Sequence, residues 1–411
     1  MVKKIIKKII PHIKIFRLAK VLRINSTILF SFLSINISKL FRGKVDNKSI
    51  VLGGSTGKAF IGNTKYLYYY LKKNTDYKLV YFVRSRDLQQ KLQKLGIKTI
   101  HAYSLKAIKT LRKCRFIFVT HGLTDIIPIR FSKKTTFIDT WHGILMKKYI
   151  NIYDTFEYSK WAKILRLKIK NDDVCDYFIT PSASKKNIDI LTKNLLLPRE
   201  KILATGYPRN DLFFSKNNKL IKVIRKKFKI SDNMKRIILY APTFRDNDLV
   251  ARFPLSKEEL LELNKLLIST NSLFLLKAHK SVKINELRSF SNIKNVNKDS
   301  DIQELLFISD ILITDYSSVY TDYLLLNRPI IFFTYDYDFY EKKNRGLLYN
   351  LKEMAPGPLV YTGKELINLI KNISVINQEY ELIRKKTNDV FNKYQDGSST
   401  ERLLKFLKII N

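Results

Sequence analysis

The sequence predicts an α/β protein built from two doubly wound domains, each containing a parallel sheet. Two observations support this fold class. Short apolar runs alternate with amphipathic helical stretches from residue 48 onward, and the alternation recurs in both halves of the chain. Polar side chains follow directly after several of the apolar runs. Strands that alternate with helices form parallel sheets, and their carboxyl ends are where open α/β sheets bind ligands.

Composition supports a large globular protein with an anionic partner. The 411 residues are enough for two domains with full cores, and the hydrophobic fraction of 45% excludes a disordered chain. There are 76 Lys and Arg against 36 Asp and Glu, a formal charge of +40. This excess fits nucleic acid, anionic lipid or a phosphate-rich substrate, although a lysine-rich genome gives the same bias. Cys114 and Cys175 are far apart in sequence, which argues against a disulfide framework or zinc site and fits a reducing compartment.

Residues 1–44 form a separate, basic segment. Lysines fall on one side of a helical wheel and isoleucines on the other: Lys3, Lys4, Lys7 and Lys8 against Ile5, Ile6, Ile9, Ile10 and Ile13. The apolar run at 24–38 is shorter than the roughly 20 residues that a membrane-spanning helix needs. We therefore expect a peripheral helix on an anionic membrane surface. The alternative is a helix packed on the protein's own core.

The first domain is expected over residues 45–215. A glycine-rich turn at 53–58 follows its first strand but lacks the GxxxxGK[ST] spacing of a Walker A loop. Residues 151–172 are basic and aromatic, so they predict a helix with either a solvated face or a second membrane contact. The expected strands are 49–52, 78–83, 98–101, 116–120, 136–140 and 177–180, and the expected helices are 63–71, 87–95 and 105–113.

The second domain is expected over residues 216–411, with the crossing between domains at 212–218. It repeats the pattern of an apolar run followed by polar side chains. The expected strands are 236–240, 272–276, 311–314 and 330–333, and the expected helices are 220–228, 257–267, 301–309, 364–372, 378–393 and 400–410. A further helix is expected directly after the turn at 315–318.

The turn at 315–318 joins a buried strand to that helix. It carries Asp315, Ser317 and Ser318. Unpaired backbone N–H groups and the helix dipole favour a phosphate at such a junction. Ser and Asp are also the ordinary helix N-cap residues, so on spacing alone these side chains could simply cap the helix.

Two histidines follow predicted strands of the first half. His142 stands in the sequence Trp141-His142-Gly143 after the strand at 136–140, and His121 follows the strand at 116–120. His142 is the better candidate for chemistry, because a histidine beside a glycine at a strand's carboxyl end lies where ligands bind. We expect His121 to line the ligand cleft.

Several of these motifs together resemble the CDP-glycerol glycerophosphotransferase family of teichoic-acid and capsule synthesis. The resemblance covers roughly residues 45–375. In the family, a Pro-Leu-Lys element follows the His-Gly pair. Here residues 142–147 read HGILMK, so the usual proline is absent and a methionine replaces leucine. The matching segments are 63–66 (NTKY), 141–143 (WHG), 180–182 (TPS), 206–211 (GYPRND), 241–246 (APTFRD), 314–318 (TDYSS) with Asp310 and Asp322, Pro329, 336–340 and 345–346.

The resemblance implies a GT-B arrangement, with a cleft between the two domains, and a specific reaction. An acceptor hydroxyl would attack the β-phosphate of CDP-glycerol, releasing CMP and forming a phosphodiester. The family pattern implies His142 as the base and places His279 as a second catalytic residue and diphosphate ligand. The remaining donor and phosphate-binding candidates are Arg245, Ser317, Ser318, Thr243, Arg209, Lys277 and Asp315.

No cofactor is expected. No carboxylate cluster suggests a Mg²⁺ site, so side chains and a helix terminus would neutralise the phosphates. The expected partners are CDP-glycerol, a lipid-linked glycan or polyol-phosphate acceptor, and the anionic cytoplasmic face of the cell membrane. One alternative is a transferase of the same fold that uses CDP-ribitol or another activated polyol or sugar. A more remote one is a non-enzymatic basic protein that binds membranes or nucleic acid, a partner the transferase hypothesis does not require.

Overall fold

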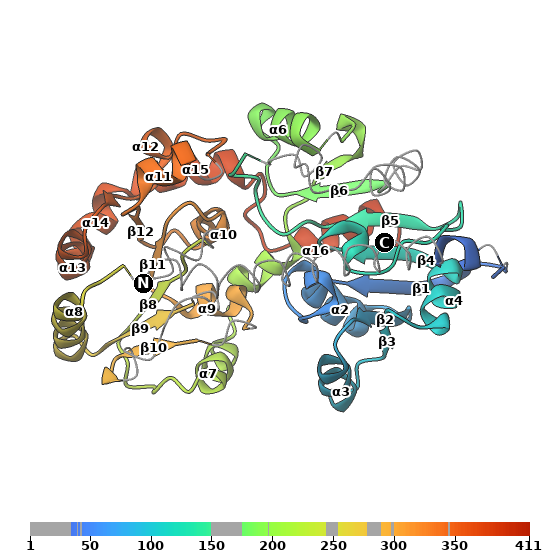
Figure 1. The fold of residues 1–411 in the computed structure, drawn as a ribbon, viewed down its shortest axis with the longest axis horizontal. Helices are drawn as coiled ribbons and strands as arrows, with labels where there is room; N and C mark the ends of the chain where they lie inside the picture. The colour runs from blue at the N-terminus through green and yellow to red at the C-terminus, as the bar shows by residue number, and fades with distance from the viewer. Residues whose placement is uncertain are drawn as a thin grey trace, which may run out of the picture. The chain divides into compact units, whose positions relative to one another are not determined.

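The computed structural model describes residues 34–38, 40–41, 43–148, 175–195, 197–243, 254–277, 289–296, 300–343 and 346–411. The chain divides into two compact units. Its helices and strands are labelled in Figure 1. Unit 1 comprises Met1–Ala59, Asp76–Asp139 and Tyr153–Asp176. Unit 2 comprises Phe60–Thr75, Thr140–Ile152 and Tyr177–Asn411.

Seven strands form the first sheet, in the order β3-β2-β1-β4-β5-β6-β7. The pairs β1–β2, β2–β3, β1–β4, β4–β5 and β6–β7 are parallel. The strands are β1 (Asp46–Gly53), β2 (Lys78–Val83), β3 (Thr99–His101), β4 (Cys114–Val119), β5 (Thr136–Asp139), β6 (Tyr177–Thr180) and β7 (Ile202–Ala204). The helices of this part of the chain are α2 (Asn63–Asn74), α3 (Arg86–Lys94), α4 (Leu105–Lys113) and α6 (Lys185–Leu195), followed by the 3-10 helix η4 (Pro208–Phe214).

Six parallel strands form the second sheet, in the order β10-β9-β8-β11-β12-β13. They are β8 (Arg236–Tyr240), β9 (Ser272–Leu276), β10 (Ile293–Asn295), β11 (Ile311–Thr314), β12 (Ile330–Phe333) and β13 (Leu359–Val360). The helices are α7 (Asn218–Lys227), α8 (Lys257–Ser269), α9 (Ile302–Ile308), α10 (Val319–Tyr323), α11 (Tyr337–Lys343), α12 (Leu351–Met354), α13 (Gly363–Lys371), α14 (Ile373–Glu379), α15 (Glu381–Phe391) and α16 (Ser399–Phe406).

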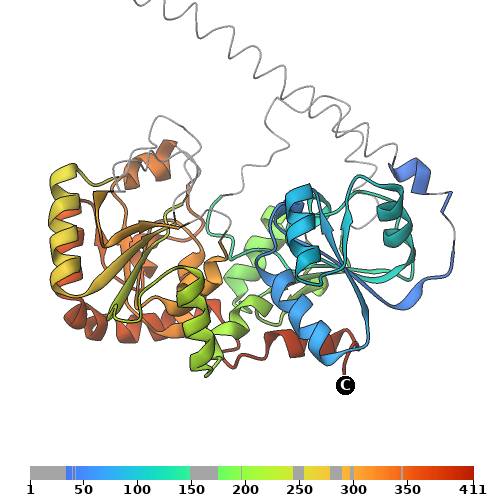
Figure 2. The same cartoon turned by 90° about the horizontal axis from the view of Figure 1, so that it is seen from below.

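The second sheet is buried on both faces, as its continuous apolar strands require. Alternate residues of β8 point to opposite faces: Ile238 and Tyr240 pack with α8 and α13, whereas Ile237 and Leu239 pack with α7 and α9. Figure 2 shows α8, in yellow, along one face of this sheet. The two helical layers make the doubly wound arrangement that alternating strands and helices predicted.

The strand orders place one switch point in each sheet. The chain moves outward from β1 through β2 to β3 and then returns to β4 on the other side of β1. It does the same from β8 through β10 to β11. Ligands of open α/β sheets bind at the carboxyl ends of strands beside such a reversal. The turns after β8 and β11 are therefore where the second sheet is expected to hold a ligand.

Several expected elements differ in detail. The helix predicted over 378–393 is present as α15, but its predicted start is too early. The chain leaves helical geometry at Tyr380, so 378–379 belong to α14. The helix after the 315–318 turn is only five residues long and continues as a 3-10 turn that ends at left-handed Asn327. Sequence analysis missed β7, β10 and β13, each of which is two or three residues long. The expected helix at 151–172 lies outside the described residues.

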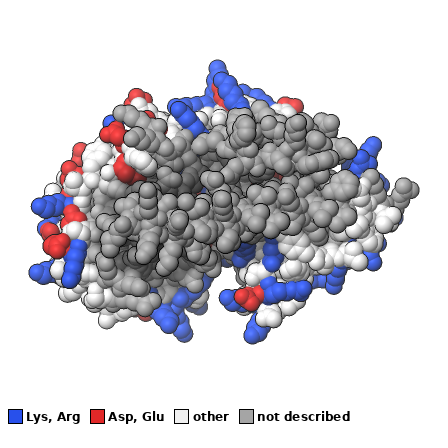
Figure 3. Space-filling view, viewed as in Figure 1, with Lys and Arg blue, Asp and Glu red and all other residues white. Residues whose placement is uncertain are grey.

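Among the described residues visible in Figure 3, the positive charge is spread over the surface. Lys and Arg side chains project at several separate places there, and acidic side chains lie among them over part of the surface. Within the part of the chain that the structure describes, no helix combines the length and the apolar character that crossing a membrane requires.

Candidate active site

His142 is presented by a strained turn three residues after β5. Trp141 has a φ of 51°, a left-handed conformation that costs a non-glycine residue about 1–2 kcal/mol. The Asn63 carboxamide holds this turn, since its Nδ2 donates to the carbonyl oxygens of Thr140 at 2.7 Å and Trp141 at 3.0 Å. The indole of Trp141 lies against the imidazole of His142, with 4.3 Å between ring centroids. The imidazole is thus oriented by both the backbone and a neighbouring ring.

The 315–318 turn leaves β11 and is fixed by interactions on two sides. The buried Asp315 carboxylate accepts the Thr243 backbone N–H at 2.8 and 3.0 Å, which ties the turn after β11 to the one after β8. Tyr316 stacks on Tyr340 at 4.0 Å between centroids. Its hydroxyl also donates to Asp336 at 3.0 Å. The backbone that carries the two serines is therefore rigidly placed.

Helix capping does not account for this turn. Ser318 is the N-cap residue of α10, and its side chain makes no capping hydrogen bond. The Ser317 hydroxyl accepts only a long contact of 3.4 Å from the backbone of Val319. Asp315 is not the N-cap residue of α10, and its carboxylate accepts the Thr243 N–H. A five-residue helix also contributes little dipole, so any anion here would be held mainly by side chains.

Gly143 brings the WHG turn directly against the serine turn. A Cβ at this position would lie 2.6 Å from the Ser318 hydroxyl oxygen, and φ of Gly143 is 155°. Both facts require glycine here. The close approach places His142 and the two serines around one pocket of about 240 Å³ within unit 2. Its lining residues are His142, Arg209, Ala241, Pro242, Lys277, Ile302, Ser317, Ser318, Val319 and Asp322.

Arg209 reaches this pocket as half of a buried ion pair. Its Nε and Nη2 donate to one oxygen of Asp322 at 3.0 and 2.7 Å, and Asn210 donates to the other at 3.0 Å. Gln303 Nε2 lies 3.3 Å from the first oxygen. Asp322 thus offsets the charge of Arg209, so the pair contributes orientation more than net positive charge.

Lysines supply cationic groups beside the serines. Lys277 lines the pocket after β9, and its ammonium donates to the Ser300 carbonyl at 2.7 Å. Lys147 lies five residues after His142 and donates to the Thr243 hydroxyl at 3.3 Å. Cations, hydroxyls and a histidine at the carboxyl ends of parallel strands can hold a phosphorylated ligand beside a proton acceptor.

The structure assembles most of the predicted site residues that it describes. His142, Arg209, Lys277, Ser317 and Ser318 line one pocket. Thr243 and Asp315 lie next to it and bond to each other. The predicted residues Arg245 and His279 lie outside the described residues.

Residues 35–408 match the family described as CDP-glycerol:poly(glycerophosphate) glycerophosphotransferase. The chain belongs to this family. It is 30% identical over 376 residues to a teichoic acid poly(glycerol phosphate) polymerase of Bacillus spizizenii, covering 88% of this chain and 92% of that protein. It is also 30% identical to a teichoic acid glycerol-phosphate transferase of Staphylococcus aureus, over 88% of this chain and 93% of that protein.

A third relative and a solved structure extend this likeness. A teichoic acid poly(ribitol-phosphate) polymerase of Bacillus spizizenii is 28% identical over 88% of this chain and 56% of its own length. The chain is 25% identical to a solved structure of a histidine variant of the wall teichoic acid polymerase TagF with CDPG. The TM-score is 0.77, and the match covers 96% of this chain and 98% of that one. The resemblance drawn from sequence motifs is therefore confirmed, and with it the GT-B type of fold with two parallel-sheet domains.

Three residues around the pocket of this family member were missed as site residues. Asn63 clamps the WHG turn, Asp322 neutralises Arg209, and Lys147 contacts Thr243. All three belong to segments that the family resemblance had already marked: Asn63 to NTKY, Lys147 to the element after His142-Gly143, and Asp322 to the TDYSS segment. That coincidence was the only available signal, because their partners lie about 80 to 150 residues away along the chain.

In unit 1, a buried carboxylate accepts a backbone N–H of the glycine-rich turn after β1. Buried Asp125 accepts the Thr56 N–H at 2.6 Å and the backbone N–H groups of Thr120 and His121 at 2.6 and 2.9 Å. The His121 Nδ1 lies 2.8 Å from the Thr120 hydroxyl, and burial lowers the pKa of His121 to about 4. His121 is therefore a neutral imidazole at pH 7.

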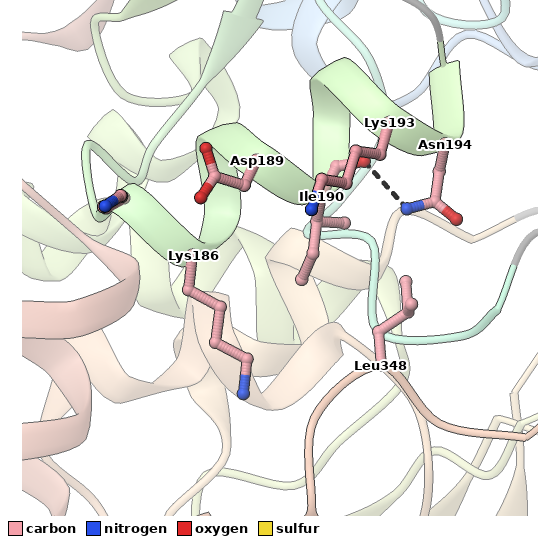
Figure 4. Close-up of a pocket in the computed structure, with 7 residues that line it drawn as sticks. Lys186, Asp189, Ile190, Lys193, Asn194 and Leu348 are labelled. Atoms are coloured by element: carbon pink, nitrogen blue, oxygen red, sulfur yellow. Dashed lines mark hydrogen bonds between the residues drawn. The ribbon is translucent and has the colours of Figure 1, made fainter.

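A larger hollow of about 620 Å³ lies along α6 in unit 2 (Figure 4). Its rim carries exposed lysine ammonium groups, and its base includes Ile190 and Leu348. Figure 4 shows the side chain of Lys186 extending away from α6, and its ammonium lies 4.7 Å from the centre of the Tyr349 ring. None of the predicted site residues lines this hollow.

Proposed function

We propose that this protein transfers glycerol phosphate from CDP-glycerol to a hydroxyl of a teichoic-acid-type acceptor and releases CMP. The observation that carries the proposal is the single pocket that gathers His142, Ser317, Ser318 and Lys277, in a chain of the glycerophosphotransferase family. A proton acceptor beside phosphate-binding groups is what this reaction needs.

In the proposed reaction, the acceptor oxygen forms a bond to the β-phosphorus of CDP-glycerol. The bond from that phosphorus to the bridging oxygen breaks, and CMP leaves with the electron pair. His142 takes the proton of the attacking hydroxyl, a role that suits the side chain whose ordinary pKa lies nearest neutral pH. The Asn63 clamp and the Trp141 ring hold its imidazole in one orientation.

Ser317, Ser318 and Lys277 would bind the diphosphate of the donor. Hydrogen bonds to a charged acceptor are stronger than neutral ones, and a nearby ammonium stabilises charge that moves to the leaving phosphate. Arg245 and His279 remain proposed diphosphate ligands, with His279 also a proposed catalytic residue, on the basis of the family motifs. Arg209 has a smaller proposed role, because its charge is already paired with Asp322.

The experiment measures CMP release by the purified full-length chain with CDP-glycerol and CDP-ribitol, using a lipid-linked acceptor. We expect CDP-glycerol to be the better donor. His142→Gln should cut turnover by about 10²-fold or more while donor binding survives. His101→Gln is the matched control, since His101 ends β3 and does not line the pocket. Near-normal turnover of His142→Gln would overturn the base assignment, and preference for CDP-ribitol would reassign the donor.

We also propose that residues 1–44 hold the enzyme at the cytoplasmic face of the membrane, where a lipid-linked acceptor presents its growing end. Four lysines at about 1 kcal/mol each would attract anionic lipid. The end of this segment packs on unit 1: buried Ser34 donates to the Pro128 carbonyl at 2.7 Å, and the Arg130 N–H donates to Ser38 at 3.1 Å.

These contacts make two truncations informative. Removing residues 2–33 should leave CMP release with a soluble acceptor analogue unchanged but lower activity on acceptor in anionic vesicles. Removing residues 2–42 should additionally lower thermal stability, because it deletes the Ser34 and Ser38 contacts. Equal loss of both activities in the shorter truncation would show that the segment belongs to the core.

A further inference from the structure

Asn63 makes three hydrogen bonds within unit 2. It is fully buried at the first position of α2, where it does not cap the helix. Its Nδ2 donates to the carbonyls of Thr140 and Trp141, and its Oδ1 accepts the Arg209 backbone N–H at 3.2 Å. The carboxamide thus uses both of its donors and its acceptor within the protein.

The two carbonyls that Asn63 binds lie on either side of one Cα. The Thr140 carbonyl belongs to the peptide before Trp141, and the Trp141 carbonyl belongs to the peptide that leads to His142. Holding both peptide planes fixes φ and ψ of Trp141 together. Trp141 needs such a constraint, because its φ of 51° is unfavourable for a bulky residue.

We propose that Asn63 is a positioning residue for His142. Its clamp fixes the left-handed turn and so aims the imidazole into the pocket. The tolerance for movement is small, because Gly143 already packs against the Ser318 hydroxyl on the other side of His142. This inference rests on the proposed role of His142 as the base.

Only a carboxamide of this length can donate to both carbonyl oxygens and accept the Arg209 N–H. A serine offers one donor, and an ionised aspartate offers none and would face two carbonyl oxygens. An alanine would leave two carbonyls and one N–H without the partner they have in the folded protein. Turnover should therefore fall in the order Asn, Ser, Ala, Asp.

The test compares Asn63→Ala and Asn63→Ser with a matched control, Asn187→Ala. Asn187 is also fully buried at the start of a helix, and its Nδ2 donates to the Thr180 hydroxyl at 3.0 Å and the Ser182 carbonyl at 3.3 Å. We expect Asn63→Ala to lower kcat by about 10²-fold with little change in CDP-glycerol affinity, because misplacing a reacting group costs about that much. Asn187→Ala should lose stability but keep kcat.

Two further measurements separate positioning from a general structural effect. The chain has only five histidines, so the ring NMR resonance of His142 can be assigned by its loss in His142→Gln. That resonance should shift or broaden in Asn63→Ser and stay unchanged in Asn187→Ala. In a double-mutant cycle, Asn63→Ala should cost no further turnover once His142 is glutamine.

The outcomes distinguish the two proposals. If His142→Gln keeps normal turnover, the proposed base is wrong, and Asn63 then has no catalytic group to position. If His142→Gln is inactive but folded Asn63→Ser and Asn63→Ala keep normal kcat, the positioning inference is wrong and the proposed function stands. An additive loss in the double mutant would likewise overturn the inference.

Discussion

The Arg209–Asp322 pair offers the sharpest prediction about stability. Its side chains are only 8% and 3% exposed, and Asp322 receives hydrogen bonds from Arg209, Asn210 and Gln303. The change Asp322→Asn keeps the shape of the side chain but removes its charge. It also replaces one acceptor oxygen with an NH₂ group that faces donors.

The expected loss follows from the burial of this pair. Removing one partner of a buried ion pair leaves the other charge uncompensated, which costs about 3–5 kcal/mol. We expect Asp322→Asn to lower the free energy of unfolding by that amount. The exposed pair Lys385–Glu381 provides the control, because Glu381→Gln should leave the free energy of unfolding almost unchanged.

The assay is urea unfolding followed by far-UV circular dichroism, with the free energy obtained by linear extrapolation. Replacing both partners, as Arg209→Met with Asp322→Leu, should recover much of the loss, since an apolar pair of similar volume avoids burying charge. A loss below about 1 kcal/mol for Asp322→Asn would refute the reasoning, because so small a loss is typical of solvent-exposed ion pairs.

Three further predictions concern the pocket and unit 1. Replacing Ser317 and Ser318 together with alanine should weaken CDP-glycerol binding by about 1.5–3 kcal/mol per lost hydrogen bond to phosphate, measured by calorimetry, with melting temperature little changed. A fall in melting temperature alone would indicate a structural role for the two serines. Gly143→Ala should abolish CMP release, because its Cβ would lie 2.6 Å from the Ser318 oxygen, and adding Ser318→Ala should restore part of it. Burial lowers the pKa of His121 to about 4, so the unfolded chain binds more protons between pH 4 and 6.5 and stability falls as pH drops through that window. His121→Gln should flatten this dependence in urea titrations at pH 5 and 7, and an unchanged slope would contradict it.

The fold could be predicted from sequence because its signals are local. Apolar runs of four to six residues give the central strands, and polar side chains after β5, β8 and β11 mark the edge of the sheets. The shortest strands were not predicted, because two or three residues are too few to show a hydrophobic periodicity. The helix break at Tyr380 was also not predicted, because no proline or glycine lies there.

The interactions that make the site could not be predicted in the same way. Arg209 and Asp322 are 113 residues apart, and the Asn63 clamp spans 77 and 78 residues to its two carbonyls. Nothing in the local sequence of Asn63 distinguishes a clamp from an ordinary helix start. The left-handed φ of Trp141 is similarly invisible, because it exists only while the tertiary contacts hold it.

The two switch points show why equivalent positions in one fold need not share a chemistry. After β1, the glycine-rich turn has Ser55 and Thr56 at positive φ, and its Thr56 N–H is bonded to the Asp125 carboxylate. The protein's own carboxylate thus occupies a place where an anion could otherwise bind. After β8 and β11, the buried carboxylate of Asp315 instead joins the two turns to each other. That arrangement leaves Ser317 and Ser318 lining the pocket with His142. A carboxylate therefore blocks one switch point and shapes the other. Among the described residues, the second switch point gathers the groups proposed to bind phosphate.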